Sequence, residues 1–139
     1  MTTLPESARD LIASGALGHL VTVNADGSPQ VSCVWVGLDG DELVVGSLGA
    51  REKLRNAERD DRVVVSFERD VTNDMGLREY LVVHGRARIT DGGAPELLQR
   101  LAHTYIGPAV KFPPMDDPPA GHVLHIVAER FHGVGPWAG

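Results

Sequence analysis

Short apolar runs separated by turn signals constrain the fold of this chain more than any other feature. Residues 17–23 and 29–36 have the length of strands, and the Asn24-Ala25-Asp26-Gly27 segment between them is typical of a hairpin turn. A second turn at residues 38–41 leads into another run, so the first half predicts a three-strand antiparallel meander. The six predicted strands cover residues 17–23, 29–36, 42–47, 62–68, 79–90 and 122–134.

Apolar residues at helical spacing predict three helices. In the second of them, Ala50, Leu54 and Ala57 share the side that should face the core. The three helices cover residues 4–14, residues 50–58 and the segment between Gly93 and Gly107.

Hairpin connections make the strands antiparallel, and the helices fill connections without alternating regularly with strands. The pattern favours a mainly β protein: one domain over residues 1–139, built as a six-stranded antiparallel β-barrel with peripheral helices. The polar segment 69–78 predicts a loop. Gly85, inside a long strand, predicts a bulge or a close backbone approach.

The composition excludes several classes of protein. A formal net charge of −6 argues against general nucleic-acid binding. No apolar run reaches the roughly 18 residues of a membrane-spanning helix, and the first residues do not resemble an export signal. Cys33 is the only cysteine, so no internal disulfide is possible. We therefore expect a cytoplasmic protein. The six histidines show no metal-ligand spacing, so no metal site is predicted.

The segment Arg51-Glu52-Lys53-Leu54-Arg55-Asn56 places three cations at the start of a helix. A helix N-terminus favours an anion, and adjacent Arg and Lys side chains strengthen that preference. This segment is therefore a candidate phosphate site, with Lys53 near the core face. The alternative is a solvated helix face, because charge runs usually lie on the surface.

Side chains alternate across the strand at residues 29–36. Gln30 and Ser32 therefore point to one side of it, and Val31, Cys33 and Trp35 point to the other. A lone cysteine inside an apolar strand favours a small core residue over a nucleophile.

Three segments together resemble the pyridoxamine 5′-phosphate oxidase-like split β-barrel proteins. They are Gly27-Ser28-Pro29-Gln30-Val31-Ser32, then Arg51-x-Lys53-x-x-Asn56, then the closing Gly133-Val134-Gly135-Pro136-Trp137. Within that superfamily, which shares an FMN-binding-like fold, the chain looks most like the actinobacterial branch that uses the deazaflavin coenzyme F420.

The resemblance implies a homodimer with two cofactor sites at the subunit interface. It implies that Arg51, Lys53 and Asn56 hold the phosphate of the coenzyme, with Ser47 near the strand end. It also implies that Gln30 and Ser32 lie along the ring system. No catalytic side chain is assigned.

The resemblance leaves three functions open. The first is an F420-dependent reductase that transfers hydride to a small unsaturated or quinone-like substrate. The second is an oxidoreductase that uses flavin mononucleotide (FMN). The third is a non-catalytic carrier of a flavin or deazaflavin. Arg55 and Arg59 follow Arg51 at one-turn intervals, so a basic track for the oligoglutamate tail of F420 is geometrically possible.

Overall fold

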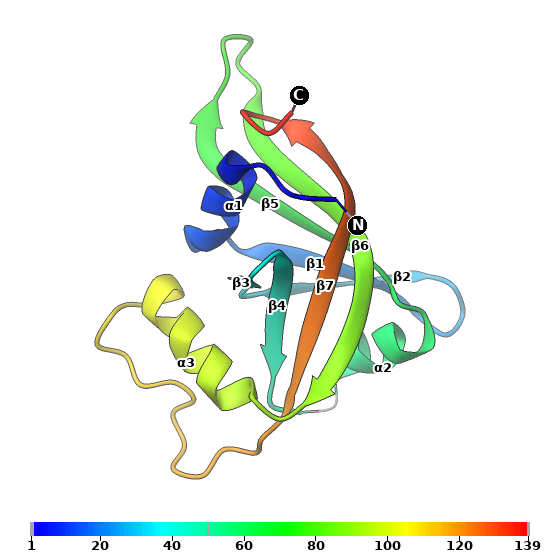
Figure 1. Ribbon diagram of the computed structural model, residues 1–139, viewed down its shortest axis with the longest axis vertical. Helices are drawn as coiled ribbons and strands as arrows, with labels where there is room; N and C mark the ends of the chain where they lie inside the picture. The colour runs from blue at the N-terminus through cyan, green and yellow to red at the C-terminus, as the bar shows by residue number, and fades with distance from the viewer. Residues whose placement is uncertain (1, 50, 139) are drawn as a thin grey trace.

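The protein is built on one curled antiparallel sheet with three helices around it (Figure 1). The computed structural model describes residues 2–49 and 51–138. Each described strand pairs with its sheet neighbours in antiparallel register, in the order β2-β1-β5-β6-β7-β4-β3. The strands are β1 (Gly18–Val23), β2 (Pro29–Val34), β3 (Gly37–Asp39), β4 (Glu42–Ser47), β5 (Arg62–Thr72), β6 (Arg78–Asp91) and β7 (His122–Val134).

The two edge strands of the sheet, β2 and β3, are neighbours in the sequence. Only Trp35 and Val36 separate them. Three residue steps span at most about 11 Å, so the sheet has to curl until its edges approach each other. The result is a barrel that is left open between β2 and β3. The mainly β, split-barrel fold expected from the sequence is confirmed.

Two details of the expected strand layout are wrong. The first half is not a meander, because β2 pairs with β1 whereas β4 pairs with β3 and β7 among the described strands. The sheet also has seven strands, because the run at residues 29–36 breaks after Val34. There the backbone N–H of Val36 donates to the Tyr105 hydroxyl at 2.9 Å, so the chain leaves the ladder.

Half of the segment at residues 69–78, expected to be a loop, is strand, and residues 73–77 form the turn. β5 and β6 extend into a hairpin that projects beyond the body, as Figure 1 shows. The Asn73 side-chain oxygen closes its turn by accepting the backbone N–H groups of Met75 and Leu77, both at 3.0 Å. An Asx turn of this kind lets polar residues end a hairpin tightly.

The interior of the barrel is filled by alternate residues of the strands. Leu20, Val65, Val83 and Ile126 are fully buried there, together with Phe67. The helices are α1 (Glu6–Ala13), α2 (Glu52–Arg59) and α3 (Ala94–Tyr105).

Two helices, α1 and α2, add their apolar faces to this core. α2 contributes Leu54 and Ala57, as expected, whereas Ala50 lies outside the described residues. α3 instead packs outside the barrel, where Leu97 and Leu101 meet Val44 of β4.

The C-terminal segment closes back on its own chain. Trp137 is buried, and its indole N–H donates to the Tyr80 carbonyl at 2.8 Å. The Arg69 guanidinium lies over the ring at 5.1 Å from the centroid. None of the described helices has the length and apolar character needed to cross a bilayer.

Gly85 lies at a close approach of β6 and β7, as the sequence predicts. The pairing of the two strands shifts between His84 and Gly85. A Cβ atom at Gly85 would lie 2.3 Å from the carbonyl oxygen of Val127, which is backbone and cannot rotate away.

We expect Gly85→Ala to destabilise the protein by about 2–3 kcal/mol, the upper part of the usual range for overpacking. Urea unfolding would measure the change. Gly107→Ala is the matched control, because the nearest atom to its added Cβ is Val110 Cγ2 at 4.0 Å. Equal stability of the two variants would show that β6 can bend away at no cost.

Candidate functional site

A cleft of about 220 Å³ lies beside the seam of the barrel, where β2 and β4 meet α2, α3 and the loop after α3. Its walls are mainly apolar, and Lys53 is the one charged side chain among its lining residues. The cleft is lined by Cys33, Val34, Trp35, Gly46, Lys53, Leu98 and Phe112.

Lys53 is half-buried at this cleft and has no acidic partner among the residues that the structure describes. The ion pairs of the described residues involve other cations. Burial lowers the pKa of Lys53 below its ordinary value, and the charge of Arg51 lowers it further. A partly desolvated cation without a counter-charge favours an incoming anion.

Arg51 stands directly before α2, at the N-cap position. Its side chain is exposed, and no side chain caps this helix end. The backbone of Arg51 is extended, so its carbonyl accepts the first helical hydrogen bonds from Leu54 and Arg55. The helix start therefore presents Arg51 and Lys53 next to unbonded N–H groups of the first turn, which suits a phosphate.

Ser47 lies at the end of β4, on the approach to this helix. Its side chain is buried, and its hydroxyl donates to the Gly49 carbonyl at 2.8 Å. Ser47 therefore shapes the turn that leads into α2, and direct contact of Ser47 with a ligand stays a prediction.

Asn56 is fully buried and uses all of its polar atoms inside the protein. Its Nδ2 donates to Thr22 Oγ1 at 3.0 Å and to Asn24 Oδ1 at 2.9 Å. Its Oδ1 accepts both terminal nitrogens of Arg59 at 3.2 Å. Asn56 therefore links α2 to β1 through hydrogen bonds. Its contact with phosphate stays a prediction.

Gln30 and Ser32 join the same network through Thr22. Thr22 Oγ1 and Ser32 Oγ both lie near Gln30 Oε1, at 3.3 and 3.4 Å. The structure thus connects three of the predicted site residues, Asn56, Gln30 and Ser32, in one chain of polar groups. Thr22 was missed by sequence reasoning. Its signal is a hydroxyl at an inward position of β1, between apolar residues.

Aromatic side chains form one wall of the cleft, and the sequence analysis did not predict this wall. Trp35 stacks on Tyr105 with centroids 5.4 Å apart and planes 15° apart, and it meets Phe112 at 5.0 Å. Phe112 comes from the proline-rich loop after α3, far along the chain. An aromatic residue in such a loop was the available signal.

Cys33 is exposed, and its expected place in the core is wrong. The inward positions of β2 are taken by Gln30, Ser32 and Val34, so Cys33 and Val31 point outward. Cys33 is one of the residues that line the cleft.

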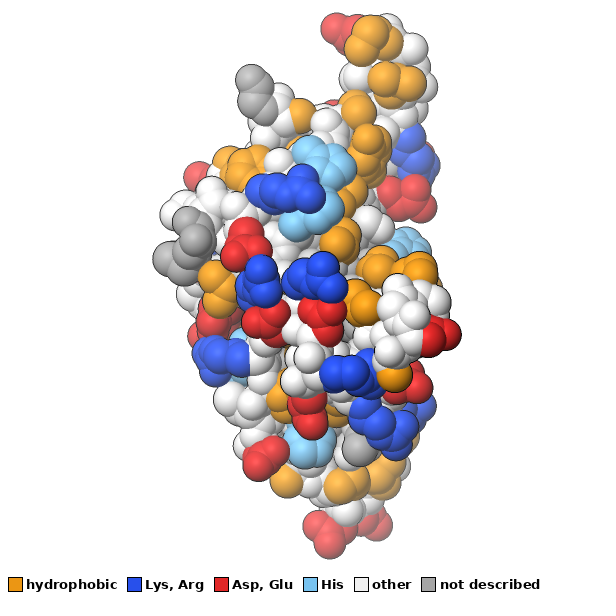
Figure 2. All heavy atoms as spheres, turned by 90° about the vertical axis from the view of Figure 1, so that its right-hand side faces the viewer, with side chains coloured by type: hydrophobic (Ala, Val, Ile, Leu, Met, Phe, Trp, Pro, Cys, Tyr) orange, Lys and Arg blue, Asp and Glu red, His pale blue; other side chains and the backbone are white. Residues whose placement is uncertain are grey.

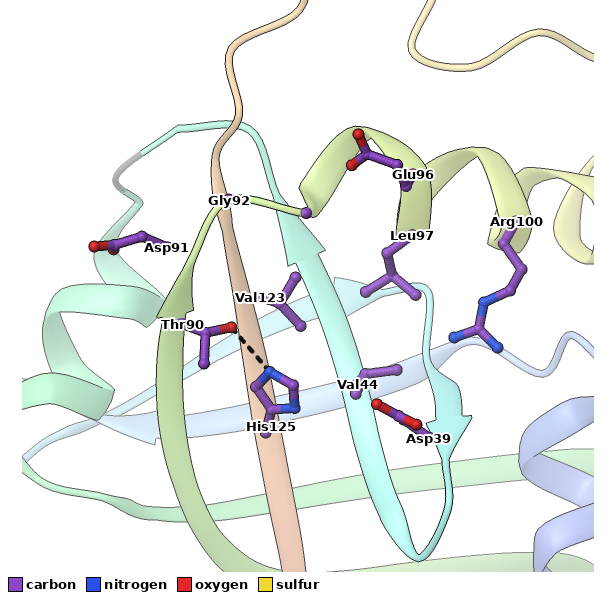
Figure 3. A pocket seen from close by; sticks show the side chains of 11 residues that line it. Asp39, Val44, Thr90, Asp91, Gly92, Glu96, Leu97, Arg100, Val123 and His125 are labelled. Carbon is purple, nitrogen blue, oxygen red and sulfur yellow. Dashed lines mark hydrogen bonds between the residues drawn. The ribbon is translucent and has the colours of Figure 1, made fainter.

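A second cleft, of about 450 Å³, lies on the opposite flank of α3 (Figure 3). Val44, Leu97 and Val123 form its apolar part, and His125 Nε2 lies 3.0 Å from the Thr90 hydroxyl. Three carboxylates line this cleft against one guanidinium, a balance that disfavours a phosphate. The charged residues are Asp39, Asp91, Glu96 and Arg100.

The face in Figure 2 carries basic and acidic side chains interleaved, not a basic surface. Arg86 contacts Asp61 and Glu129 at 2.8 and 3.4 Å, and Arg88 contacts Glu42 at 2.8 Å. The described residues contain no cluster of three or more potential metal ligands.

Comparison with solved structures places this geometry among known folds. A protein described as an F420 reductase is 27% identical, with a TM-score of 0.71, and the match covers 93% of this chain and 98% of that one. The conserved hypothetical protein Rv2991 from Mycobacterium tuberculosis is 23% identical, with a TM-score of 0.71 and coverages of 96% and 85%.

A heme binding protein from Mycobacterium smegmatis has the same fold at 24% identity and a TM-score of 0.66, with coverages of 96% and 55%. No curated protein matches the chain. A family model described as pyridoxamine 5′-phosphate oxidase matches residues 4–135. Since that match spans nearly the whole sequence, the chain belongs to the pyridoxamine 5′-phosphate oxidase family.

Proposed function

We propose that the protein is an F420-dependent oxidoreductase that reduces a small unsaturated or quinone-like substrate. The observation that carries the proposal is Lys53, a half-buried cation without an acidic partner at an aromatic cleft. Such a site fits a ligand that joins a phosphate to a planar ring. The 27% identity to an F420 reductase supports the deazaflavin as that ligand.

The residues of this chain divide the work of binding. Arg51 and Lys53 would hold the phosphate, and Trp35 and Phe112 would line the place of the ring. Gln30 and Ser32 point to the other side of β2, so their contact with the ring stays a prediction. Bound deazaflavin supplies hydride chemistry, whereas the protein contributes orientation and shielding from water. Asn56 acts behind these groups by fixing α2 on β1.

FMN is the second candidate cofactor, and one contact favours it. Arg59, the far end of the possible basic track, donates to Asn56 Oδ1 and to the Val23 carbonyl at 3.3 Å. Its guanidinium is therefore less available to the oligoglutamate tail of F420, a tail that FMN does not have. A carrier is the third candidate, and the similarity to an F420 reductase favours an enzyme over it.

Titration of the purified protein with F420 and with FMN, followed by fluorescence, tests the proposal. We expect tighter binding of F420 and a steeper loss of its affinity with added salt, because its tail adds exposed charges. Tight binding of FMN alone would make the second candidate correct. No binding of either compound would overturn the proposed function.

We further propose that the protein is a homodimer and that its cofactor sites lie at the interface. The outward side of β2 exposes Val31, with 58% of its surface accessible, beside Cys33. Apolar side chains on an edge strand of a sheet favour pairing with another chain. A cytoplasmic location stays a prediction.

Light scattering of the purified protein should therefore report a dimer, and Val31→Asp should shift it toward monomer. Ile106→Asp is the control, since Ile106 is also 54% exposed but lies after α3. A monomeric wild-type protein at micromolar concentration would contradict the interfacial site.

Lys53→Met should weaken cofactor binding by roughly ten- to hundredfold, because a charge-assisted hydrogen bond to phosphate is lost. Its unfolding free energy should not fall, since the substitution removes a partly buried charge that has no partner. Lys111→Met, at the other lysine of the chain, should change neither property. Lost stability with unchanged affinity would assign Lys53 a structural role.

Cofactor affinity should fall as pH rises, at a pH below the ordinary lysine pKa of about 10.4. Burial lowers the pKa of Lys53, so its ammonium is lost earlier than that of an exposed lysine. Lys53→Arg keeps its charge throughout and should give a flat profile. Identical pH profiles for both proteins would show that Lys53 does not contact the anion.

A further inference from the structure

The loop at residues 107–121, between α3 and β7, is held in its middle by one side chain. Gln99 Nε2 donates to the Val110 carbonyl at 2.8 Å, and Gln99 Oε1 accepts the backbone N–H of Phe112 at 2.9 Å. Backbone hydrogen bonds anchor the ends of the loop, from Gly107 N–H to the Ala102 carbonyl and from Ala94 N–H to the Ala120 carbonyl. The position of Phe112 therefore depends on Gln99.

Trp35, the other half of this aromatic wall, is fixed by other contacts. Trp35 stacks on Tyr105, whose hydroxyl donates to the Ala16 carbonyl at 2.8 Å and accepts the N–H of Val36. Burial raises the pKa of Tyr105 above its ordinary value, so the hydroxyl keeps the proton that it donates. Trp35 is thus held by α3 and by the seam of the barrel, independently of the loop.

We infer that Gln99 is a positioning residue that sets the aromatic wall of the cleft, on which a planar ring would lie, by holding Phe112 against Trp35. Gln99 does not line this cleft; it lines a neighbouring hollow of about 300 Å³ that Phe112 also lines. The inference rests on the proposed function, because it concerns the ring of the same cofactor. It adds to the site a residue of α3 that acts on the cleft without lining it.

The two hydrogen bonds from Gln99 to the loop require an amide side chain. A glutamine side chain offers one donor and one acceptor at the same distance from its backbone, and the loop uses both. Gln99→Glu keeps the acceptor for Phe112 N–H but places a carboxylate against the Val110 carbonyl. Gln99→Met has a similar length and loses both hydrogen bonds. Both variants should therefore weaken ring binding, and the loss should be larger for Gln99→Met.

The experiment compares a ring-bearing probe with a ring-free one. Fluorescence titration gives the affinity for F420 or FMN, whichever the wild-type protein binds, and competition against it gives the affinity for inorganic phosphate. Gln99→Met should weaken ring binding by about three- to tenfold, the usual worth of an aromatic contact, and leave phosphate affinity unchanged. Arg100→Met, on the flank of α3 that lines the other cleft, is the matched control and should change neither affinity.

A second measurement separates positioning from a general loss of structure. In a Phe112→Ala background, Gln99→Met should have no further effect on ring affinity, since the group that it positions is gone. In the free protein, Gln99→Met should make Trp35 more accessible to quenching by acrylamide. Trp137 is only 2% exposed, so Trp35 dominates this signal.

The possible outcomes separate a failure of the positioning role of Gln99 from a failure of the proposed function. Equal losses of ring and phosphate affinity, or a Gln99→Met effect that persists without Phe112, would overturn the positioning role. Unchanged ring affinity in Gln99→Met would also overturn it, with the proposed function intact. A wild-type protein that binds neither cofactor would overturn the proposed function, and with it this role for Gln99.

Discussion

The buried amide of Asn56 is the contact on which the geometry of the site depends. It ties α2 to β1 through Thr22 and Asn24, and it engages the Arg59 guanidinium from within its own helix. A fully buried amide with all its hydrogen bonds made is costly to disturb, because each lost partner leaves a polar group unsatisfied. The start of α2, and with it the direction of Lys53, is therefore fixed before any ligand binds.

The open seam of the barrel is the second constraint. The two edge strands are joined by a two-residue link. The Tyr105 hydroxyl accepts the backbone N–H that Val36 would otherwise donate to a neighbouring strand. The same tyrosine supports Trp35, so the break in the sheet and the aromatic wall have one cause. The cleft lies beside this seam, where the backbone turns away and side chains from α3 and the loop can enter.

The sequence predicted the elements that depend on local pattern. The hairpin turns, the inward face of α2 and the close approach at Gly85 all follow from spacing and residue type. The strand at residues 29–36 was predicted too long, and the core position predicted for Cys33 is wrong. Its apolar residues Val31 and Cys33 point outward, while Gln30 and Ser32 point inward to a polar network. The Trp35–Phe112 pair could not be predicted, because it joins residues 77 apart through a loop whose path depends on Gln99.

The central claim is that the cofactor ring occupies the cleft beside Lys53. Cys33 provides a direct test, because it is the single cysteine and it lines that cleft. The rate of its alkylation by iodoacetamide can be measured with and without saturating F420 or FMN. The account predicts marked protection by the bound cofactor and little protection by inorganic phosphate. An unchanged alkylation rate in protein shown to have cofactor bound would place the ring elsewhere and contradict the account.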